Sequence, residues 1–383
     1  MKKTLSLSFL LVLLCLSLGC AAKCALILVQ EYMAADGGSE GVSKAYQSIK
    51  QNDLSFFVLG RNEIWVNLYG AVQRAAGVDV IPDEDRSVYR LSNDALSFRT
   101  QEEPAFSTGE TECIRAIKRT SDAVGAQSWF VFIPNKFCKQ EVTYASRGLK
   151  DVSSDRQQTE IAAFRQAGYS VLDLHGSMHA QKMRHVDLFF RTDHHWKTGT
   201  ALWAAREIAK TFGLDTSALR ADHFTYKAFP GLFLGSEGKH CGRFYCRPDD
   251  FELLLPKENT DFTLTFLETG ETRTGGFDKS LLFQQHLERK ICQQNAYAVF
   301  LNGDKSVTIQ NNLNPNGPHI TFIKNSFTNS VAPYLSLLCS RVDLLDPRNE
   351  NDKERILPFI QENRPDFVCV SISNSMGSHT LEF

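Results

Sequence analysis

The six residues Arg-Thr-Asp-His-His-Trp at positions 191–196 place an acid, two imidazoles and an indole side by side. An amphipathic pattern follows over residues 198–212 and predicts a helix with Thr198 as its N-cap. In an extended segment, Asp193 and His195 would point to the same side because side chains alternate along a strand. The acid could then hold one ring nitrogen of His195 while the other nitrogen acts as a base.

A hydroxyl that such a base could activate lies far downstream. Residues 320–323 have the apolar pattern of a short strand, residues 328–338 have a helical pattern, and Ser326 falls between them. In open α/β sheets the ligand crevice lies at the carboxyl ends of the strands. The start of the next helix also offers backbone N–H groups for an oxyanion. Since a serine hydroxyl needs an adjacent base to become a nucleophile, the two segments together predict a triad of Asp193, His195 and Ser326.

The rest of the chain alternates between strand and helix patterns from about residue 110. Continuous apolar runs are typical of strands buried on both faces, and their alternation with helices predicts a parallel α/β sheet. The strands are expected at 129–134, 169–174, 320–323, 342–345 and 367–370, and the helices at 111–124, 159–167, 328–338 and 354–363. Residues 214–318 interrupt this order with a loop at 231–250 and antiparallel strands within 251–267. They predict a small inserted β-element.

The N-terminus has the features of an export segment. Two lysines precede an almost wholly apolar run at residues 5–18, which is short for a membrane span. We expect residues 1–22 to be a signal peptide or a membrane anchor and residues 23–383 to form a single domain. A lipoprotein at Cys20 is a third reading, although Ser17 stands where a lipobox has an apolar residue. All three place the folded part outside the cytoplasm.

Composition and cysteines add two expectations. With 42 Lys+Arg against 44 Asp+Glu, the net charge of −2 gives no basic excess for a nucleic-acid partner. Export would permit disulfides. The close spacing of Cys241 and Cys246 predicts a local bridge, and Cys113 and Cys138 could also pair.

The adjacent imidazoles have an alternative interpretation as metal ligands. His194 and His195 are accompanied along the chain by Asp193 and by three further histidines, His175, His179 and His185. No pair with ligand spacing falls on a clear helix pattern, and no cysteine pairs have zinc-finger spacing. We therefore expect no metal and no cofactor.

The segment 192–196, Thr-Asp-His-His-Trp, resembles the signature of the bacterial DHHW protein family. That family is related to the SGNH-hydrolase-like alginate O-acetyltransferases, which carry an acid-x-histidine-tryptophan version of the segment. The resemblance runs from about Gly60 to the C-terminus and includes residues 235–239 and 324–327. In the last segment the family usually has Lys-Asp-Ser, and this chain has Asn325 in place of the aspartate.

This resemblance implies a flavodoxin-like, SGNH-hydrolase-like domain in which the order of the motifs is permuted. Ordinary members place the serine first, whereas here it comes last. The resemblance implies that Ser326 is the nucleophile, His195 the base and Asp193 its orienter. Further candidates for oxyanion or substrate contacts are the Ser326 N–H, Asn329, Asn374, His194, Trp196, Arg191, Lys324 and Asn325.

The implied function is an exported acyltransferase that O-acetylates a cell-envelope or extracellular polysaccharide through an acyl-serine. Relatives act outside the cytoplasmic membrane, often with acyl groups supplied by a multi-pass membrane acyltransferase. Two alternatives stay open. The same triad would make a carbohydrate esterase if water replaced the sugar, and a fold that had lost catalysis would be a carbohydrate-binding or assembly factor.

Overall fold

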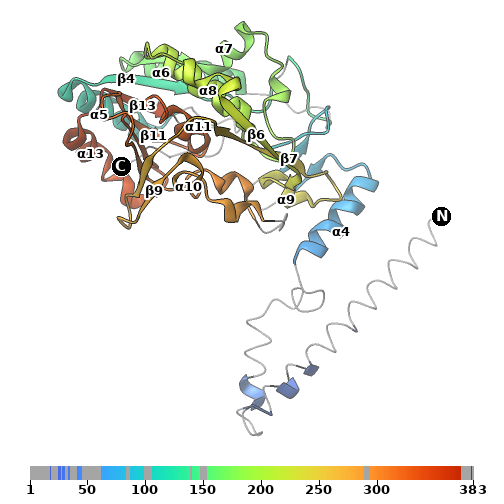
Figure 1. Ribbon diagram of the computed structural model, residues 1–383. Coiled ribbons are helices and arrows are strands. Elements are labelled where there is room, and N and C mark those ends of the chain that lie inside the picture. Colours follow the sequence, from blue (N-terminus) through green and yellow to red (C-terminus); the bar gives the residue numbers. More distant parts are fainter. Residues whose placement is uncertain are drawn as a thin grey trace. The chain divides into compact units, whose positions relative to one another are not determined.

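The structure is a computed structural model (Figure 1). It describes residues 18, 25–26, 28–30, 33–34, 41–44, 62–82, 87–98, 106–138, 140–146, 153–288, 294–371 and 381. The chain divides into two compact units, residues 1–75 and 76–383. The main element of the first is helix α4 (Asn62–Ala75). Among the described helices, none is long and apolar enough to span a bilayer. Apart from Leu18, the expected signal or anchor at 1–22, Cys20 included, lies outside the described residues.

The second unit is built on an eight-stranded sheet with the order β5-β4-β13-β11-β12-β10-β8-β9. Its first five strands are parallel: β5 (Ser170–Asp173), β4 (Gln127–Phe132), β13 (Phe367–Ser371), β11 (His319–Lys324) and β12 (Arg341–Leu345). The other three are antiparallel to their neighbours: β10 (Val307–Asn311), β8 (Phe262–Phe266) and β9 (Thr272–Gly275). The predicted α/β class, with a central and mostly parallel sheet, is confirmed.

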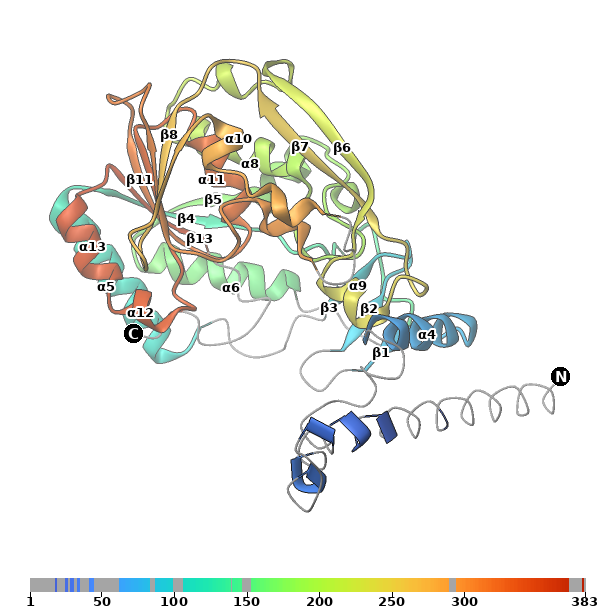
Figure 2. The same ribbon diagram turned by 60° about the horizontal axis from the view of Figure 1, so that its bottom comes forward.

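Helices cover both faces of this sheet because the parallel strands are apolar on both sides. On β4, Phe130 and Phe132 join one buried cluster, whereas Val131 and the following Ile133 join another. One face carries α5 (Thr108–Val124), α6 (Ser153–Gln166) and α13 (Ile356–Asn363), and the other carries α8 (Thr198–Thr211) and α11 (Thr328–Leu335) (Figure 2).

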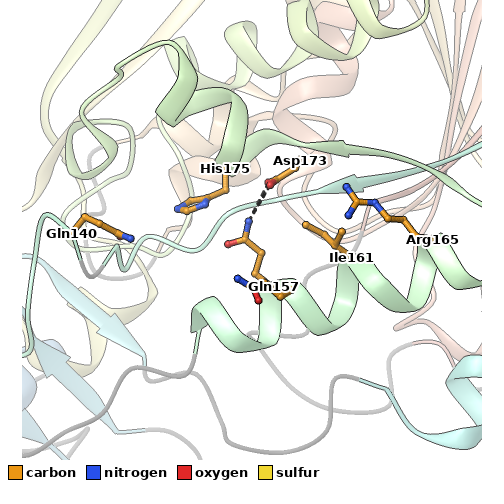
Figure 3. A pocket seen from close by; sticks show the side chains of 7 residues that line it. Gln140, Gln157, Ile161, Arg165, Asp173 and His175 are labelled. Carbon is orange, nitrogen blue, oxygen red and sulfur yellow. Dashed lines mark hydrogen bonds between the residues drawn. The ribbon is translucent and has the colours of Figure 1, made fainter.

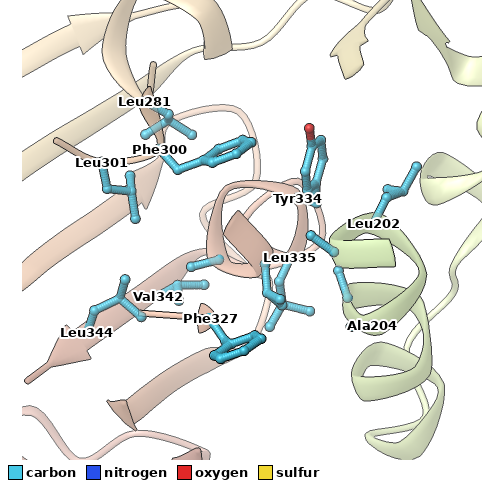
Figure 4. Packing of buried hydrophobic residues seen from close by; sticks show 14 of the residues in the cluster. Leu202, Ala204, Leu281, Phe300, Leu301, Phe327, Tyr334, Leu335, Val342 and Leu344 are labelled. Carbon is cyan, nitrogen blue, oxygen red and sulfur yellow. The ribbon is translucent and has the colours of Figure 1, made fainter. Parts of the chain in front are cut away.

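The packing of α8 against α11 positions the site. Leu202 and Ala204 of α8 face Tyr334 and Leu335 of α11, with Phe327 beneath them (Figure 4). The small alanine side chains on α8 let the two helices approach closely. The residues just before each helix are therefore brought to the same region of the molecule.

The remaining elements of the second unit lie outside the eight-stranded sheet. A three-stranded sheet contains β1 (Val80–Ile81), β2 (Val88–Arg90) and β3 (Leu96–Phe98), and a two-stranded sheet contains β6 (Phe224–Phe233) and β7 (Asp249–Pro256). The short helices are α7 (Leu174–Ala180), α9 (Ser236–Cys241), α10 (Phe277–Ser280), α12 (Glu350–Lys353), and the 3₁₀ turns η1 (His185–Asp187), η2 (Ser217–Leu219), η3 (Ala221–His223), η4 (Gln284–Leu287) and η5 (Ala296–Val299).

The inserted segment differs from the prediction in where its strands pair. β7 and β8 overlap the antiparallel strands expected within 251–267, but they belong to different sheets: β7 pairs with β6, and β8 pairs with β10 and β9. β8 buries every second side chain, which suits an antiparallel edge of the main sheet. Within the expected loop at 231–250, residues 236–241 form α9.

Two local predictions about helix starts are wrong. Lys197, not Thr198, is the N-cap of α8, and the Thr198 hydroxyl donates to the Glu252 carbonyl at 2.7 Å instead of capping the helix. Leu174, expected to end a strand, is the first residue of α7, because Asp173 caps that helix by accepting the Gly176 N–H.

The predicted bridge between Cys241 and Cys246 is also wrong, since both are thiols. They are buried in the apolar cluster formed around Ile81 and Leu234. Burial raises the pKa of the Cys246 thiol to about 12, so it is unreactive in the folded protein. Cys113 and Cys138 are not bridged to each other either.

Candidate active site

Asp193, His195 and Ser326 meet in a chain of hydrogen bonds. Asp193 Oδ1 lies 2.5 Å from His195 Nδ1, and His195 Nε2 lies 2.7 Å from Ser326 Oγ. The three side chains are almost fully buried, and Ser326 keeps 9% of its surface exposed. The structure therefore brings together the acid, the imidazole and the hydroxyl that the sequence singled out.

The acid and the imidazole do not sit on an extended segment as expected. The His195 N–H donates to Asp193 Oδ1 at 2.9 Å, and this local bond bends the chain into a turn. The Ser236 N–H donates to the other carboxylate oxygen at 2.7 Å. Both oxygens of Asp193 are therefore occupied, and the carboxylate is held in one orientation towards His195.

Gly235 allows this close approach. A Cβ atom at Gly235 would lie 2.1 Å from Asp193 Cβ, far inside van der Waals contact. The Gly235 N–H donates to Thr192 Oγ1 at 3.0 Å, and the Gly238 N–H donates to the Thr192 carbonyl at 2.8 Å. Residues 235–238 therefore lie directly against the acid–histidine turn, where only glycine fits at position 235.

Lys136 is a third support that the sequence analysis missed. Its ammonium donates to the carbonyls of Phe190, Arg191 and Asp193 at 3.1, 3.2 and 2.8 Å. A lysine two residues beyond the predicted strand at 129–134 was the available signal, because the carboxyl ends of parallel strands meet at one edge of the sheet. Lys136 fixes the backbone that carries the acid.

Ser326 lies in the turn between β11 and α11, as predicted. Asn325 Oδ1 accepts the Phe327 N–H at 3.1 Å, and the Asn325 N–H donates to the Ser371 carbonyl of β13 at 3.0 Å. An amide oxygen can accept the same bond as the carboxylate that the DHHW family usually has here. The exchange of aspartate for Asn325 therefore preserves the turn that presents Ser326.

The His195 ring packs against two aromatic side chains. Tyr297 stacks on it with ring centroids 3.9 Å apart and an interplanar angle of 18°, and the Phe327 ring centroid is 4.8 Å away. The Tyr297 hydroxyl and the Trp196 indole N–H both bond to Ser330 Oγ, at 2.7 and 2.9 Å. The sequence analysis did not single out Tyr297, which η5 brings to the site from the inserted segment.

Residues 93–234 match the family described as the SGNH hydrolase-like domain of the acetyltransferase AlgX. The match confirms the recognition of an SGNH-hydrolase-like domain, and it includes Asp193 and His195 but ends before Ser326. No protein with a curated description matches the sequence.

Solved structures show the same fold. A DHHW family protein from Eubacterium siraeum superposes with a TM-score of 0.58 at 17% identity, covering 79% of this chain and 96% of that chain. PatB1 of Bacillus cereus carrying a sulfonyl adduct superposes with a TM-score of 0.57 at 18% identity, covering 78% and 97%. A second structure of PatB1 of Bacillus cereus superposes with a TM-score of 0.56 at 19% identity, covering 79% of this chain and 99% of that chain.

A group of charged side chains lies beside Asp193 and His195. Glu237 Oε2 lies 3.5 Å from His194 Nδ1, and Glu237 Oε1 lies 3.8 Å from Lys136 Nζ. Burial alone would lower the pKa of His194, but Asp193 and Glu237 together raise it. His194 therefore favours its charged form, and its cost of burial is offset by the two carboxylates.

The electrostatics separate the two histidines. Burial, together with the charge on His194, lowers the pKa of His195 in spite of Asp193. Burial would raise the pKa of Asp193, but both imidazoles and the Ser236 N–H hold it well below its usual range. At neutral pH the site therefore holds an ionised acid beside a neutral imidazole that can accept a proton.

This arrangement predicts the pH dependence of any reaction that uses His195 as a base. Activity is lost when His195 becomes protonated, so the acid limb of kcat/KM should lie below the ordinary imidazole pKa of 6.5. Replacing His194→Gln removes the neighbouring positive charge and should move this limb to higher pH. His223→Gln, on the exposed η3 turn, is the control and should leave it in place. If the acid limb of kcat/KM stays at the same pH in His194→Gln, the charge on His194 does not influence the pKa of His195, and the prediction is contradicted.

The remaining site candidates have distinct positions. Trp196 is 1% exposed and packs in the core, and the amide of Asn329 donates to Asp304 at 2.9 Å, so we interpret both as supports of the site. The exposed Arg191 contributes its backbone N–H to Asp249 at 3.0 Å. Asn374 lies outside the described residues.

Lys324 is a support too, because it is fully buried in an ion pair. Its ammonium donates to Asp346 at 2.8 Å, and Arg348 bonds to the same carboxylate. Burial would raise the pKa of Asp346, yet the two cations lower it to about 2.

Replacing Lys324→Met should destabilise the protein because it leaves the buried carboxylate of Asp346 with one cation instead of two. We expect a loss of about 3 kcal/mol in the free energy of unfolding, measured by urea denaturation at neutral pH. The exposed Lys210, paired with Glu207 on the surface of α8, provides the matched control. Lys210→Met should change stability by less than about 1 kcal/mol. Equal effects of the two substitutions would contradict this role of Lys324.

Proposed function

We propose that this protein is a serine-dependent O-acyltransferase of the SGNH-hydrolase-like type. One observation carries the proposal: His195 Nε2 is 2.7 Å from Ser326 Oγ while His195 Nδ1 is 2.5 Å from Asp193. The match of residues 93–234 to an acetyltransferase domain supports acyl transfer at the level of the family.

In the first half-reaction, Ser326 Oγ attacks the carbonyl carbon of an acetyl donor while His195 Nε2 takes the hydroxyl proton. The imidazolium that forms lies against the ionised Asp193. The tetrahedral intermediate collapses when His195 returns the proton to the leaving oxygen, and the acetyl group remains on Ser326.

The negative oxygen of the intermediate needs hydrogen-bond donors. The Ser326 N–H makes no hydrogen bond to another described residue, and it precedes the N-terminus of α11, where the helix dipole is positive. We assign this N–H as the first oxyanion donor. Asn329 already donates one N–H to Asp304, which makes it the weaker candidate.

In the second half-reaction, a sugar hydroxyl attacks the acyl-serine and gives its proton to His195. His195 returns this proton to Ser326 Oγ as the bond between the serine and the acyl carbon breaks, and the sugar leaves as its acetyl ester. We propose a cell-envelope or extracellular polysaccharide as the acceptor, with export through the N-terminal segment and a multi-pass membrane acyltransferase as the supplier of acyl groups. These parts rest on the lysine-flanked apolar run at residues 5–18 and on the resemblance to the alginate acetyltransferases.

The test of the proposal is to trap and then discharge the acyl-serine. The purified protein is incubated with a chromogenic acetyl ester and quenched in acid, and peptide mass spectrometry should find one acetyl group on Ser326. Adding oligosaccharide acceptors should speed donor turnover and yield acetylated sugar. Turnover to free acetate alone would assign an esterase. Absence of both acetyl-serine and labelling by a fluorophosphonate probe would favour a non-catalytic binding factor.

A further inference from the structure

Four side chains outside the triad form a compact cluster of potential metal ligands: Cys138, His175, His179 and His185. Their ligand atoms all lie within 4.8 Å of one another. The Nε2 atoms of His175 and His179 are 3.1 Å apart, and Cys138 Sγ is 3.8 Å from His179 Nε2. With bonds of about 2.0–2.3 Å, the ligand atoms of a tetrahedral zinc site are about 3.3–3.6 Å apart. The distances between the ligand atoms of the cluster are therefore close to those in a zinc site.

Two of these ligands come from one short helix. His175 and His179 are four residues apart on α7, so they project from the same face. Asp173 fixes the start of α7 by accepting the Gly176 N–H at 3.0 Å, and Gln157 of α6 donates to the same carboxylate at 3.2 Å. Figure 3 shows His175 beside this contact, at the edge of a cavity of about 550 Å³. The histidine pair is thus held in place and reachable from solvent.

His185 provides an independent observation. It is fully buried, and its Nε2–H donates to the Asn135 carbonyl at 2.6 Å. This bond leaves Nδ1 as the nitrogen with the lone pair, and Nδ1 has no hydrogen-bond partner among the described residues. A buried, unpaired acceptor is costly. Histidine ligands of metals usually donate their second N–H to a carbonyl or carboxylate, as His185 does to Asn135.

We propose that Cys138, His175, His179 and His185 bind one Zn²⁺ ion. Three imidazoles and one thiolate suit tetrahedral zinc, and four protein ligands leave no open position, as in structural sites. The ion would tie the chain that follows β4 to α7 and η1. The same chain segment contains Asn135, which holds His185, and Lys136, which holds the backbone of Asp193. The zinc would therefore stabilise the platform on which the acid rests, without contacting the reacting atoms.

The test measures metal binding rather than activity. The full chain is stripped with a chelator, loaded with Zn²⁺ or Co²⁺, and assayed for metal content by plasma mass spectrometry. We expect one ion per chain. Bound Co²⁺ should give the strong visible bands of tetrahedral coordination and a near-ultraviolet charge-transfer band from the thiolate. Cys138→Ser should remove the charge-transfer band. The exposed His179 can be replaced with little risk to the core, and His179→Ala should weaken Zn²⁺ binding by more than the roughly 10–100-fold typical of a lost outer-shell partner.

Two controls locate the site. His223→Ala removes a histidine of η3 and should leave binding unchanged. His194→Gln alters the second group of potential ligands, Asp193, His194 and His195, and should also leave one ion bound. The proposal is overturned if the stripped chain takes up no ion at micromolar free Zn²⁺, if His179→Ala binds as tightly as the unaltered protein, or if His194→Gln abolishes binding. Circular dichroism of each variant separates loss of the ion from loss of the fold.

Discussion

Replacing Ser326→Ala should abolish acetyl-ester turnover and leave the fold intact. In the proposed reaction the Ser326 hydroxyl is the group of the protein that bonds to the acyl carbon, so its loss removes the covalent path. We expect kcat to fall at least about 10³-fold, because nucleophile, base and acid act as a unit. The measurement is hydrolysis of a chromogenic acetyl ester, together with the midpoint of thermal unfolding.

The kcat of His195→Ala should fall almost as far as that of Ser326→Ala. The kcat of the double variant should be no lower than that of either single variant. Ser330→Ala is the matched control. It removes a buried hydroxyl from α11, the helix that follows Ser326. This hydroxyl bonds to Trp196 and Tyr297 rather than to His195. The Ser330→Ala variant should retain most of the activity. Unaltered turnover by Ser326→Ala would assign the activity to another group and end the triad proposal.

Gly235 places no side chain in the site. Among such residues, its replacement Gly235→Ala should lower kcat the most. The added methyl would lie 2.1 Å from Asp193 Cβ and 2.5 Å from Asp193 Oδ2, so either the turn or the carboxylate must move. A displaced acid no longer holds His195 in the correct tautomer. We expect kcat to fall by about 10²–10⁴-fold, up to the loss seen when the acid of a serine triad is neutralised.

The control is a glycine-to-alanine substitution at a position where the added methyl group has room. A Cβ at Gly199, in the first turn of α8, would meet only Glu252 Oε1 at 3.5 Å, which is ordinary contact. Gly199→Ala should keep both activity and stability, because alanine favours the helix. The thermal midpoint of Gly235→Ala should be measured beside its kcat. Full activity in a stably folded Gly235→Ala variant would contradict the requirement for close approach.

The sequence predicted the parallel half of the fold well because its signal is local. Buried strands contain continuous apolar runs, as residues 129–132 do within β4, and the turn with Ser326 falls between a strand pattern and a helix pattern. The antiparallel half was less predictable. Which strand bonds to β8 depends on how residues far apart in the chain meet, and periodicity does not carry that information.

The candidate site divides in the same way. Residue types and the family resemblance singled out Asp193, His195 and Ser326, because their functional groups can be read directly from the sequence. Lys136 and Tyr297 went unnoticed because each acts through a contact with a distant segment. The ligand spacing of His175 and His179 was hidden as well, since the strand pattern was extended to Leu174, which instead begins α7.

The bond between His195 and Ser326 joins residues 131 positions apart, and this separation has a consequence for when the protein becomes active. The turn that presents Ser326 is anchored by the Asn325 N–H on Ser371, so it is complete only after β13 has docked between β4 and β11. Such long-range closure is a slow step in folding. A chain in which β13 has not yet docked therefore carries Asp193 and His195 without the completed turn that presents Ser326. Under the proposed function, reactivity towards acyl donors would begin only when the chain has folded as far as β13.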